Sequence, residues 1–187
     1  MIVLGIDPGS ITTGWALLRS VRNNGHYVAS GVLQFSAKTP FLDRLKEIKQ
    51  KSEDLILETN PDEISLESLI YVKSPTALIK LAQARGVIIA AMVDRFTGKL
   101  FEYSPNLIKS TAVGHGHADK ESVRKFIDMM LGKREYATHD ESDAIAIALC
   151  HIMNRGNVKL KKTKSAKKTK SSSNSLAAAL EHRVGKS

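Results

Sequence analysis

The alternation of strand and helix patterns constrains this fold more than any other feature of the chain. Residues 2–6 form a short apolar run that ends at Asp7-Pro8-Gly9, which predicts a buried strand followed by a turn. Residues 15–19 and 27–35 are rich in strand-forming side chains, and the pair Asn24-Gly25 lies between them, as in a hairpin. We therefore expect the first three strands to form an antiparallel meander.

Helical patterns follow the meander. Thr39-Pro40 and Ser74-Pro75 each place a capping residue before a proline, which is a favoured helix start, and apolar residues then recur at helical spacing. Residues 63–67 alternate as a strand does, and residues 100–103 predict a short fifth strand. The order of elements predicts an α/β fold with a mixed five-stranded sheet flanked by helices.

Two further helices are expected near the end of this pattern. Asp119 can cap the first, and Thr138 with Glu141 matches a capping box for the second. The single cysteine, Cys150, falls in the apolar pattern of the last helix, so we expect a core residue and no intramolecular disulfide. No secretory signal and no unbroken apolar segment of spanning length are evident, so we expect a cytoplasmic protein without a membrane span.

The positive charge is concentrated in one segment. Residues 155–187 hold ten Lys or Arg and one acid, and so carry the whole formal net charge of +9, whereas residues 1–154 hold 18 of each sign. We therefore predict a folded domain over residues 1–154 and a basic, disordered tail over residues 155–187. Such a tail binds DNA without regard to sequence, or serves only to keep the protein in solution.

Four carboxylates from three distant segments are expected to converge. Asp7 and Glu67 each end a predicted strand, at the edge of the sheet where α/β folds place ligands. Asp140 and Asp143 are three residues apart in the first turn of a predicted helix, so they share one face. Carboxylate oxygens are ligands that Mg²⁺ prefers, and two such ions about 4 Å apart can promote phosphodiester hydrolysis.

Each acid also has an ordinary explanation. An Asp before Pro-Gly often only forms a turn, a pair of Asp residues at a helix start often only complements the helix dipole, and Glu67 alone resembles any surface acid. The combination of all four in this order is what favours a metal site.

The same residues resemble the motifs of the RuvC family of Holliday-junction resolvases, which have a ribonuclease H-like fold. The resemblance spans residues 1 to about 153 and is carried by four segments, Leu4–Gly14, Ile64–Glu67, Leu81–Gly86 and Asp140–Ala148. It implies that Asp7, Glu67, Asp140 and Asp143 bind two Mg²⁺ or Mn²⁺ ions. It also implies a homodimer that nicks a four-way DNA junction symmetrically, and branch-migration motor proteins as possible partners.

Further residues are candidates for contact with DNA. By the resemblance, Lys109 and Lys120 bind backbone phosphate or stabilise the transition state, although surface lysines are common without such a role. Family members carry an aromatic residue three positions after the second acid; this chain has Ile70 there, and Tyr71 is the aromatic candidate for stacking on a base. The complete set of additional DNA-binding candidates is Tyr71, Lys73, Arg85, His115 and His117.

Three alternatives remain open from the sequence. A related ribonuclease H-like nuclease would act on structured RNA with similar acids. A sugar-kinase-like phosphotransferase would also carry a loop such as Asp7–Gly14, but it needs a second domain and a second phosphate loop, which this chain lacks. A non-catalytic junction-binding protein would be expected to have lost one or more of the four acids, which are all present.

Overall fold

A computed structural model describes residues 1–69, 74–114 and 119–155, which all belong to one compact unit, Met1–Asn157. Its five strands pair in the order β3-β2-β1-β4-β5. The first three are antiparallel neighbours, and β4 and β5 run parallel to β1, so the predicted meander and mixed sheet are confirmed. The strands are β1 (Ile2–Asp7), β2 (Thr12–Val21), β3 (Asn24–Gln34), β4 (Glu63–Glu67) and β5 (Lys99–Tyr103).

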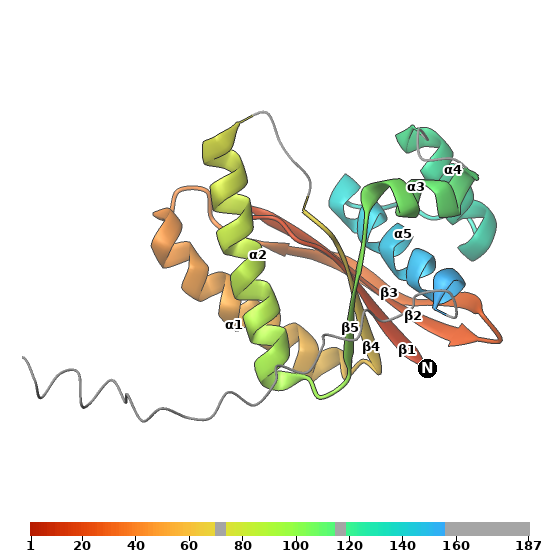
Figure 1. The fold of residues 1–187 in the computed structure, drawn as a ribbon, viewed down its shortest axis with the longest axis horizontal. Helices are drawn as coiled ribbons and strands as arrows, with labels where there is room; N and C mark the ends of the chain where they lie inside the picture. The colour runs from red at the N-terminus through yellow and green to blue at the C-terminus, as the bar shows by residue number, and fades with distance from the viewer. Residues whose placement is uncertain (70–73, 115–118, 156–187) are drawn as a thin grey trace, which may run out of the picture. The chain divides into compact units, whose positions relative to one another are not determined.

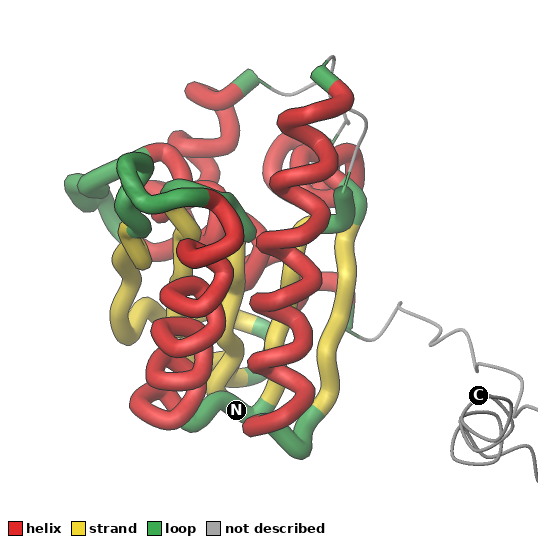
Figure 2. Tube along the Cα trace, turned by 90° about the vertical axis from the view of Figure 1, so that its left-hand side faces the viewer, coloured by secondary structure: helices red, strands yellow, loops and turns green. Residues whose placement is uncertain are grey.

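Helices cover both faces of the sheet (Figure 1). Helices α1 and α2 pack against each other on one face, and α5 crosses β1 and β2 on the other, with α3 and α4 beside it. Figure 2, seen from the side of α1 and α2, shows these two helices lying in front of the strands. The helices are α1 (Phe41–Thr59), α2 (Pro75–Arg95), α3 (Pro105–Val113), α4 (Lys120–Leu131) and α5 (His139–Asn154).

Strand alternation divides the buried residues between the two layers. Leu4 and Ile6 of β1 and Ile64 and Leu66 of β4 belong to the core beneath α1 and α2. The intervening residues face α5, as the close approach of Gly5 to that helix shows. Strands β1 and β4 therefore send their alternate side chains, including those of their last residues, toward the α5 layer.

The hairpin turn differs from the prediction. Arg22 and Asn23 have positive φ angles of 50° and 64° and form the turn, so Asn24 and Gly25 already belong to β3. Gly25 serves a different purpose, because a Cβ there would lie 2.8 Å from Leu149 Cδ2 of α5. The sequence signal identified the hairpin but misplaced its turn, and Gly25 lies instead against the Leu149 side chain.

Helix α1 differs in its start and in its buried face. Pro40 rather than Thr39 occupies the capping position, and no side chain caps the helix. Leu42, expected in the apolar stripe, is 71% exposed, whereas Arg44 is buried and donates hydrogen bonds to the Ser10, Ala37 and Thr39 carbonyl oxygens. The arginine thus supports two loops from beneath, which helical periodicity could not reveal.

Helix α2 is, among the described residues, the one helix long and apolar enough to cross a membrane by length and composition alone. The sequence prediction of no span rested on an unbroken apolar run, which Lys80 and Arg85 interrupt here. Only 22% of this apolar window is buried: α2 buries Ala84, Ile88 and Met92 on its inner face and leaves its outer face exposed.

Candidate active site

Two parallel neighbouring strands bring Asp7 and Glu67 together. Strand β1 pairs with β4 in a register that places Ile6 opposite Leu66, so the next residue on each strand is an acid. Both acids end their strands and face the α5 layer. The sequence prediction that these strands are neighbours and that their acids converge is confirmed by this pairing.

Two glycines allow α5 to approach these strands closely. A Cβ at Gly5 would lie 2.3 Å from the Ala144 carbonyl oxygen, and a Cβ at Gly14 would lie 1.9 Å from the Asp140 carbonyl oxygen. Because Gly14 pairs with Asp7 across the sheet, the first turn of α5 lies directly over the end of β1. This contact brings Asp140 and Asp143 to the strand acids.

The start of α5 has the Thr138 half of the predicted capping box, while the Glu141 side chain makes contacts that the sequence did not suggest. Thr138 Oγ1 accepts a hydrogen bond from the Glu141 amide at 3.2 Å. The Glu141 carboxylate is buried, accepts from the Ala137 amide at 2.8 Å, and accepts from Ser30 Oγ of β3 at 2.6 Å. The first turn of α5, which carries Asp140 and Asp143, is therefore attached to β3 through the Glu141 side chain.

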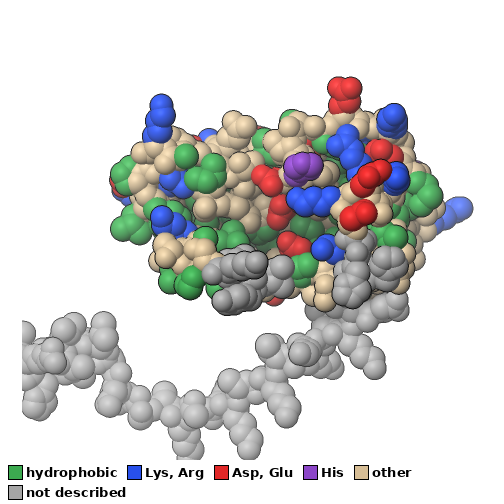
Figure 3. Space-filling view, turned by 90° about the horizontal axis from the view of Figure 1, so that it is seen from above, with side chains coloured by type: hydrophobic (Ala, Val, Ile, Leu, Met, Phe, Trp, Pro, Cys, Tyr) green, Lys and Arg blue, Asp and Glu red, His purple; other side chains and the backbone are tan. Residues whose placement is uncertain are grey.

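A cavity of about 230 Å³ lies where these elements meet. Three of the four predicted acids line it, and so do both predicted lysines, Lys109 from α3 and Lys120 at the start of α4. Seen from the end of the sheet where β1 and β4 stop, acidic side chains gather near the middle of the face with basic side chains and a histidine beside them (Figure 3). The predicted acids of the cavity are Asp7, Glu67 and Asp143, and Asp119, which caps α4, lines it as well.

The carboxylates oppose one another's ionisation. Burial raises the pKa of Asp7 to about 8, assisted by the neighbouring charges of Asp143, Glu67 and Asp140. Burial and then Asp143 raise the pKa of Glu67, while Lys109 lowers it. Burial also raises the pKa of Asp143, against the nearby ammonium group of Lys120. Acids held together at this cost have an electrostatic reason to bind a cation.

The fourth acid, Asp140, is near enough to affect the pKa of Asp7 and of Asp143, but it does not line the cavity. In the part of the chain that the structure describes, no three acidic, histidine or cysteine side chains already surround one point as a finished metal cage. The donors nevertheless suit a hard cation, because three partly buried carboxylates face one cavity and repel one another.

Arg85 has partners within the chain. Its guanidinium donates to the Glu67 carbonyl oxygen at 3.2 Å and to Glu102 Oε1 at 2.6 Å, and its side chain is 12% exposed. It borders a second hollow that also contains Asp7, Glu67 and Leu81. The structure therefore assigns Arg85 a role in fixing the end of β4, and its contact with DNA stays a prediction.

Four other DNA-binding candidates lie outside the described residues. They are Tyr71, Lys73, His115 and His117. The two segments that contain them border the site in sequence, since one follows Glu67 and the other precedes Lys120.

Sequence patterns missed two supports of the site. Helix α3, which presents Lys109, was not predicted, although Ser104-Pro105 is the same start signal that identified α2, and Ser104 Oγ accepts from the Leu107 amide. Arg44 was missed because no local signal marks it. Its bond to Ser10 holds the loop that follows Asp7.

Comparison with known proteins gives consistent matches. The family model described as crossover junction endodeoxyribonuclease RuvC matches residues 3–151. Proteins of that name from Bartonella bacilliformis and Lawsonia intracellularis are 36% and 39% identical, over 83% and 80% of this chain and 92% and 89% of theirs. Thermus thermophilus RuvC, solved in complex with Holliday junction substrate, superposes with a TM-score of 0.76 at 25% identity, over 83% of this chain and 94% of that chain.

Proposed function

The chain belongs to the RuvC family of crossover junction endodeoxyribonucleases, and we propose that it resolves four-way DNA junctions by Mg²⁺-dependent hydrolysis as a homodimer. The observation that carries the proposal is the cavity at the end of β1 and β4, where three partly buried carboxylates meet two lysines. A family member was solved with a Holliday junction, which supports the same substrate here.

In this proposal Asp7, Glu67, Asp140 and Asp143 hold two Mg²⁺ ions, with Mn²⁺ as a possible substitute, and Asp7 lies between the others. When bound, the ions supply Lewis-acid stabilisation of the charge that develops during phosphodiester cleavage. The protein orients the carboxylates through the strand ends and the fixed first turn of α5. It also keeps the site partly buried, which strengthens every electrostatic contact there.

Lys109 and Lys120 complete the site from the opposite wall. Both line the cavity, and both lower the pKa of Asp143, so their ammonium groups lie close to the acids. We assign them to the phosphate oxygens of the strand being cut. Removal of either should weaken transition-state stabilisation more than substrate binding.

The decisive experiment uses a synthetic four-way junction in Mg²⁺. The parent should make paired, symmetric nicks, and Asp7→Asn should bind the junction without cutting it. Asp54→Asn, which changes an exposed acid on α1, is the matched control and should cut normally. Binding without cutting by the parent in both Mg²⁺ and Mn²⁺ would favour a junction-binding protein. No junction preference, with cutting of structured RNA, would favour the ribonuclease alternative.

The exposed outward face of α2 supports the proposal of a homodimer. Ile79 and Val93 are 58% and 60% exposed, and Ala82, Gly86 and Ala90 continue the same exposed, apolar or small-residue surface. A Cβ at Gly86 would meet nothing within 4 Å, so a second helix can approach closely there. Two sites related by a twofold axis match the symmetry of two opposed scissile strands.

Light scattering tests the dimer. Val93→Glu should yield a folded monomer that nicks one strand at a time, whereas Leu57→Glu, on the equally exposed surface of α1, should leave the dimer intact. A parent protein that is monomeric while resolving junctions would refute the dimer. A cytoplasmic location and a branch-migration motor as partner are proposed on family membership alone.

A further inference from the structure

A third hollow continues from the active-site cavity along α4 and α5. It has a volume of about 210 Å³ and shares Lys120, Val123 and Asp143 with the first cavity. Arg124, one turn after Lys120 on α4, and His139, the first residue of α5, supply further nitrogen groups to its wall. Lys120 and Arg124 therefore place two positive charges on the surface adjoining the proposed scissile phosphate, beside the acids Glu121 and Asp143.

Two guanidinium groups beside this hollow are held by aromatic rings. The Arg124 guanidinium carbon lies 4.8 Å from the centre of the Tyr136 ring, and Arg124 donates to the Arg134 carbonyl oxygen at 3.2 Å. The Arg134 guanidinium carbon lies 3.9 Å from the centre of the Tyr27 ring on β3. Stacking fixes the plane of a guanidinium while leaving edge N–H groups available to a phosphate.

Neither group is neutralised by an acid. Within the three described ranges, no carboxylate lies at ion-pair distance from Arg124 or Arg134, whereas Arg85, Arg95 and Arg155 each have one. Stacking without a carboxylate partner leaves the positive charge of both groups uncompensated by an ion pair.

Two of the four acids in residues 119–135 are occupied elsewhere, whereas Asp128, one turn after Arg124 on α4, adds to burial in raising the pKa of Tyr136 and so also lies near the stacked guanidinium. Asp119 caps α4 through the Ser122 amide, and Glu121 pairs with Lys125 at 2.8 Å. Glu135 is exposed beside Arg134 and reduces the positive potential there. The two stacked arginines and Lys120 still form a continuous basic line from the cavity to β3.

We propose that Lys120, Arg124 and Arg134, here named the cation track, bind successive backbone phosphates of the DNA strand that flanks the scissile phosphate. Lys120 and Arg124 are about 6 Å apart along the helix axis, and Arg134 extends the line through its contact with Arg124. The cation track would recognise the negative charge of the DNA backbone and not the base sequence. This inference rests on the proposed junction-cutting function and specifies which side of the site carries the flanking strand.

Salt dependence of junction binding tests the track. Arg124→Gln and Arg134→Gln should each lower affinity roughly 5- to 10-fold near 0.1 M salt and reduce the slope of log K against log salt by about 0.9. Arg95→Gln, an arginine paired with Glu53 at the far end of α2, is the matched control. Lys125→Gln, on α4 but paired with Glu121, should also leave the slope unchanged. Arg124→Lys keeps the charge and should retain the slope.

A second measurement uses the unaltered protein, in case a glutamine variant folds poorly. Phenylglyoxal modification followed by mass spectrometry should show that a bound junction protects Arg124 and Arg134 but not Arg95. Parental slopes in both glutamine variants, or unprotected Arg124 and Arg134, would overturn the track while junction cutting by the parent still stood. Absence of junction binding and cutting by the parent would instead overturn the proposed function.

Discussion

The two ends of strand β4 carry the same residue type in opposite circumstances. Glu63 and Glu67 are four residues apart and face the same α5 layer. Hydrogen bonds from Arg155 and His151 hold the pKa of Glu63 below its usual value, although burial opposes them. Burial and the charge of Asp143 raise the pKa of Glu67. One acid is fully paired, and the other is crowded with carboxylates.

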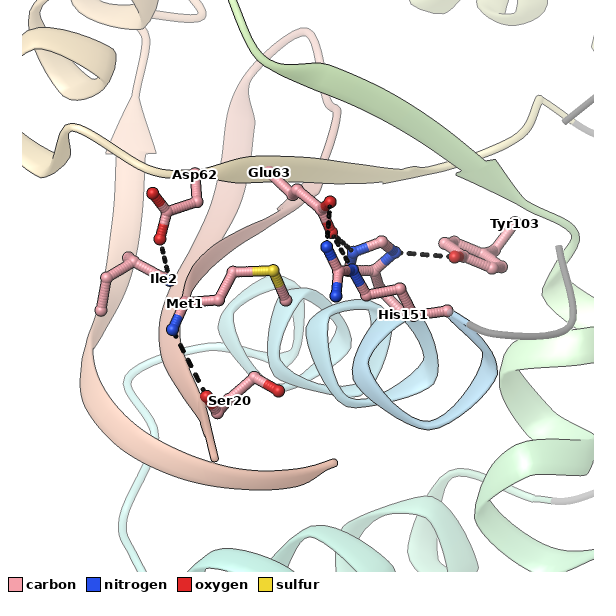
Figure 4. Close-up of polar contacts among 8 residues, drawn as sticks. Met1, Ile2, Ser20, Asp62, Glu63, Tyr103 and His151 are labelled. Atoms are coloured by element: carbon pink, nitrogen blue, oxygen red, sulfur yellow. Dashed lines mark hydrogen bonds and ion pairs between the residues drawn. The ribbon is translucent and has the colours of Figure 1, made fainter. Parts of the chain in front are cut away.

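Figure 4 shows the paired end. His151 lies fully buried, with Nε2 at 2.7 Å from Glu63 Oε2 and Nδ1 at 2.7 Å from the Tyr103 hydroxyl. Arg155 donates two hydrogen bonds to Glu63, at 2.7 and 2.8 Å. The network joins β4, β5 and the end of α5, so it fixes the frame from which Glu67 and Asp143 project. The sheet is therefore stabilised at one end by paired charges. At the other end the carboxylates repel one another, and in the proposed reaction a bound cation would relieve that repulsion.

The largest expected effect separates the two glutamates by activity. Glu67→Gln should lower the rate of junction cleavage about 10³-fold, because a metal-holding carboxylate is lost. Glu63→Gln should cut at nearly the parental rate at a temperature where it is folded. Single-turnover cleavage measures both. Equal losses of cleavage rate in the two variants would contradict the assignment of Glu67 to catalysis and of Glu63 to structure.

The stability of the folded protein should depend on the paired end of β4, around Glu63, rather than on the crowded end. His151→Ala removes one hydrogen bond from Glu63, which keeps Arg155, leaves the buried Tyr103 hydroxyl without its partner, and should lower the free energy of unfolding by about 3 kcal/mol. His26→Ala, at an exposed position of β3, is the matched control and should have little effect. Urea unfolding measures the difference, and similar small losses in the two variants would contradict the role of the network.

The crowded end should also be sensitive to backbone displacement. Gly14→Ala would force the first turn of α5 away from β1, because its Cβ would lie 1.9 Å from the Asp140 carbonyl oxygen. Cleavage should fall about 10²-fold as the acids move apart. Gly31→Ala on β3 meets only the Trp15 side chain, at 3.1 Å, and should cut almost normally. Normal cutting by Gly14→Ala would show that the acids tolerate this shift.

The smallest effect concerns pH in the metal-free protein. The pKa of Asp7 rises on folding from an ordinary 3.8 to about 8, so the folded state retains a proton that the unfolded chain releases. The contribution of the protonated Asp7 to the free energy of unfolding is therefore fully present below about pH 4 and is lost as the pH rises from about 4 to 8. Asp7→Asn should raise Tm at pH 8 by about 3–6 °C and have less effect at pH 5. A lower Tm for Asp7→Asn at pH 8 with chelator present would contradict this account.

Much of the site could be predicted because its signals are local. Asp7 and Glu67 follow recognisable strand patterns, and the capping box at Thr138 fixed where Asp143 lies on its helix. Lys109 was identified only by resemblance, since its helix α3 was missed despite a clear start signal. The cation track was not predicted at all, because its arginines are defined by rings on other segments.

The sequence by itself determined the mixed sheet, the order of the elements other than α3, and the places of Asp7 and Glu67 at strand ends and of Asp140 and Asp143 at a helix start, since periodicity and capping depend on neighbours along the chain. Only the tertiary structure decided which side chains compensate one another. Arg44 is buried and hydrogen-bonds to the loop at Ser10, and Arg85 forms an ion pair with Glu102. Gly25 lies in β3 against the Leu149 side chain rather than in the turn. Each outcome depends on a residue brought from a distant segment, and no local pattern encodes that partner.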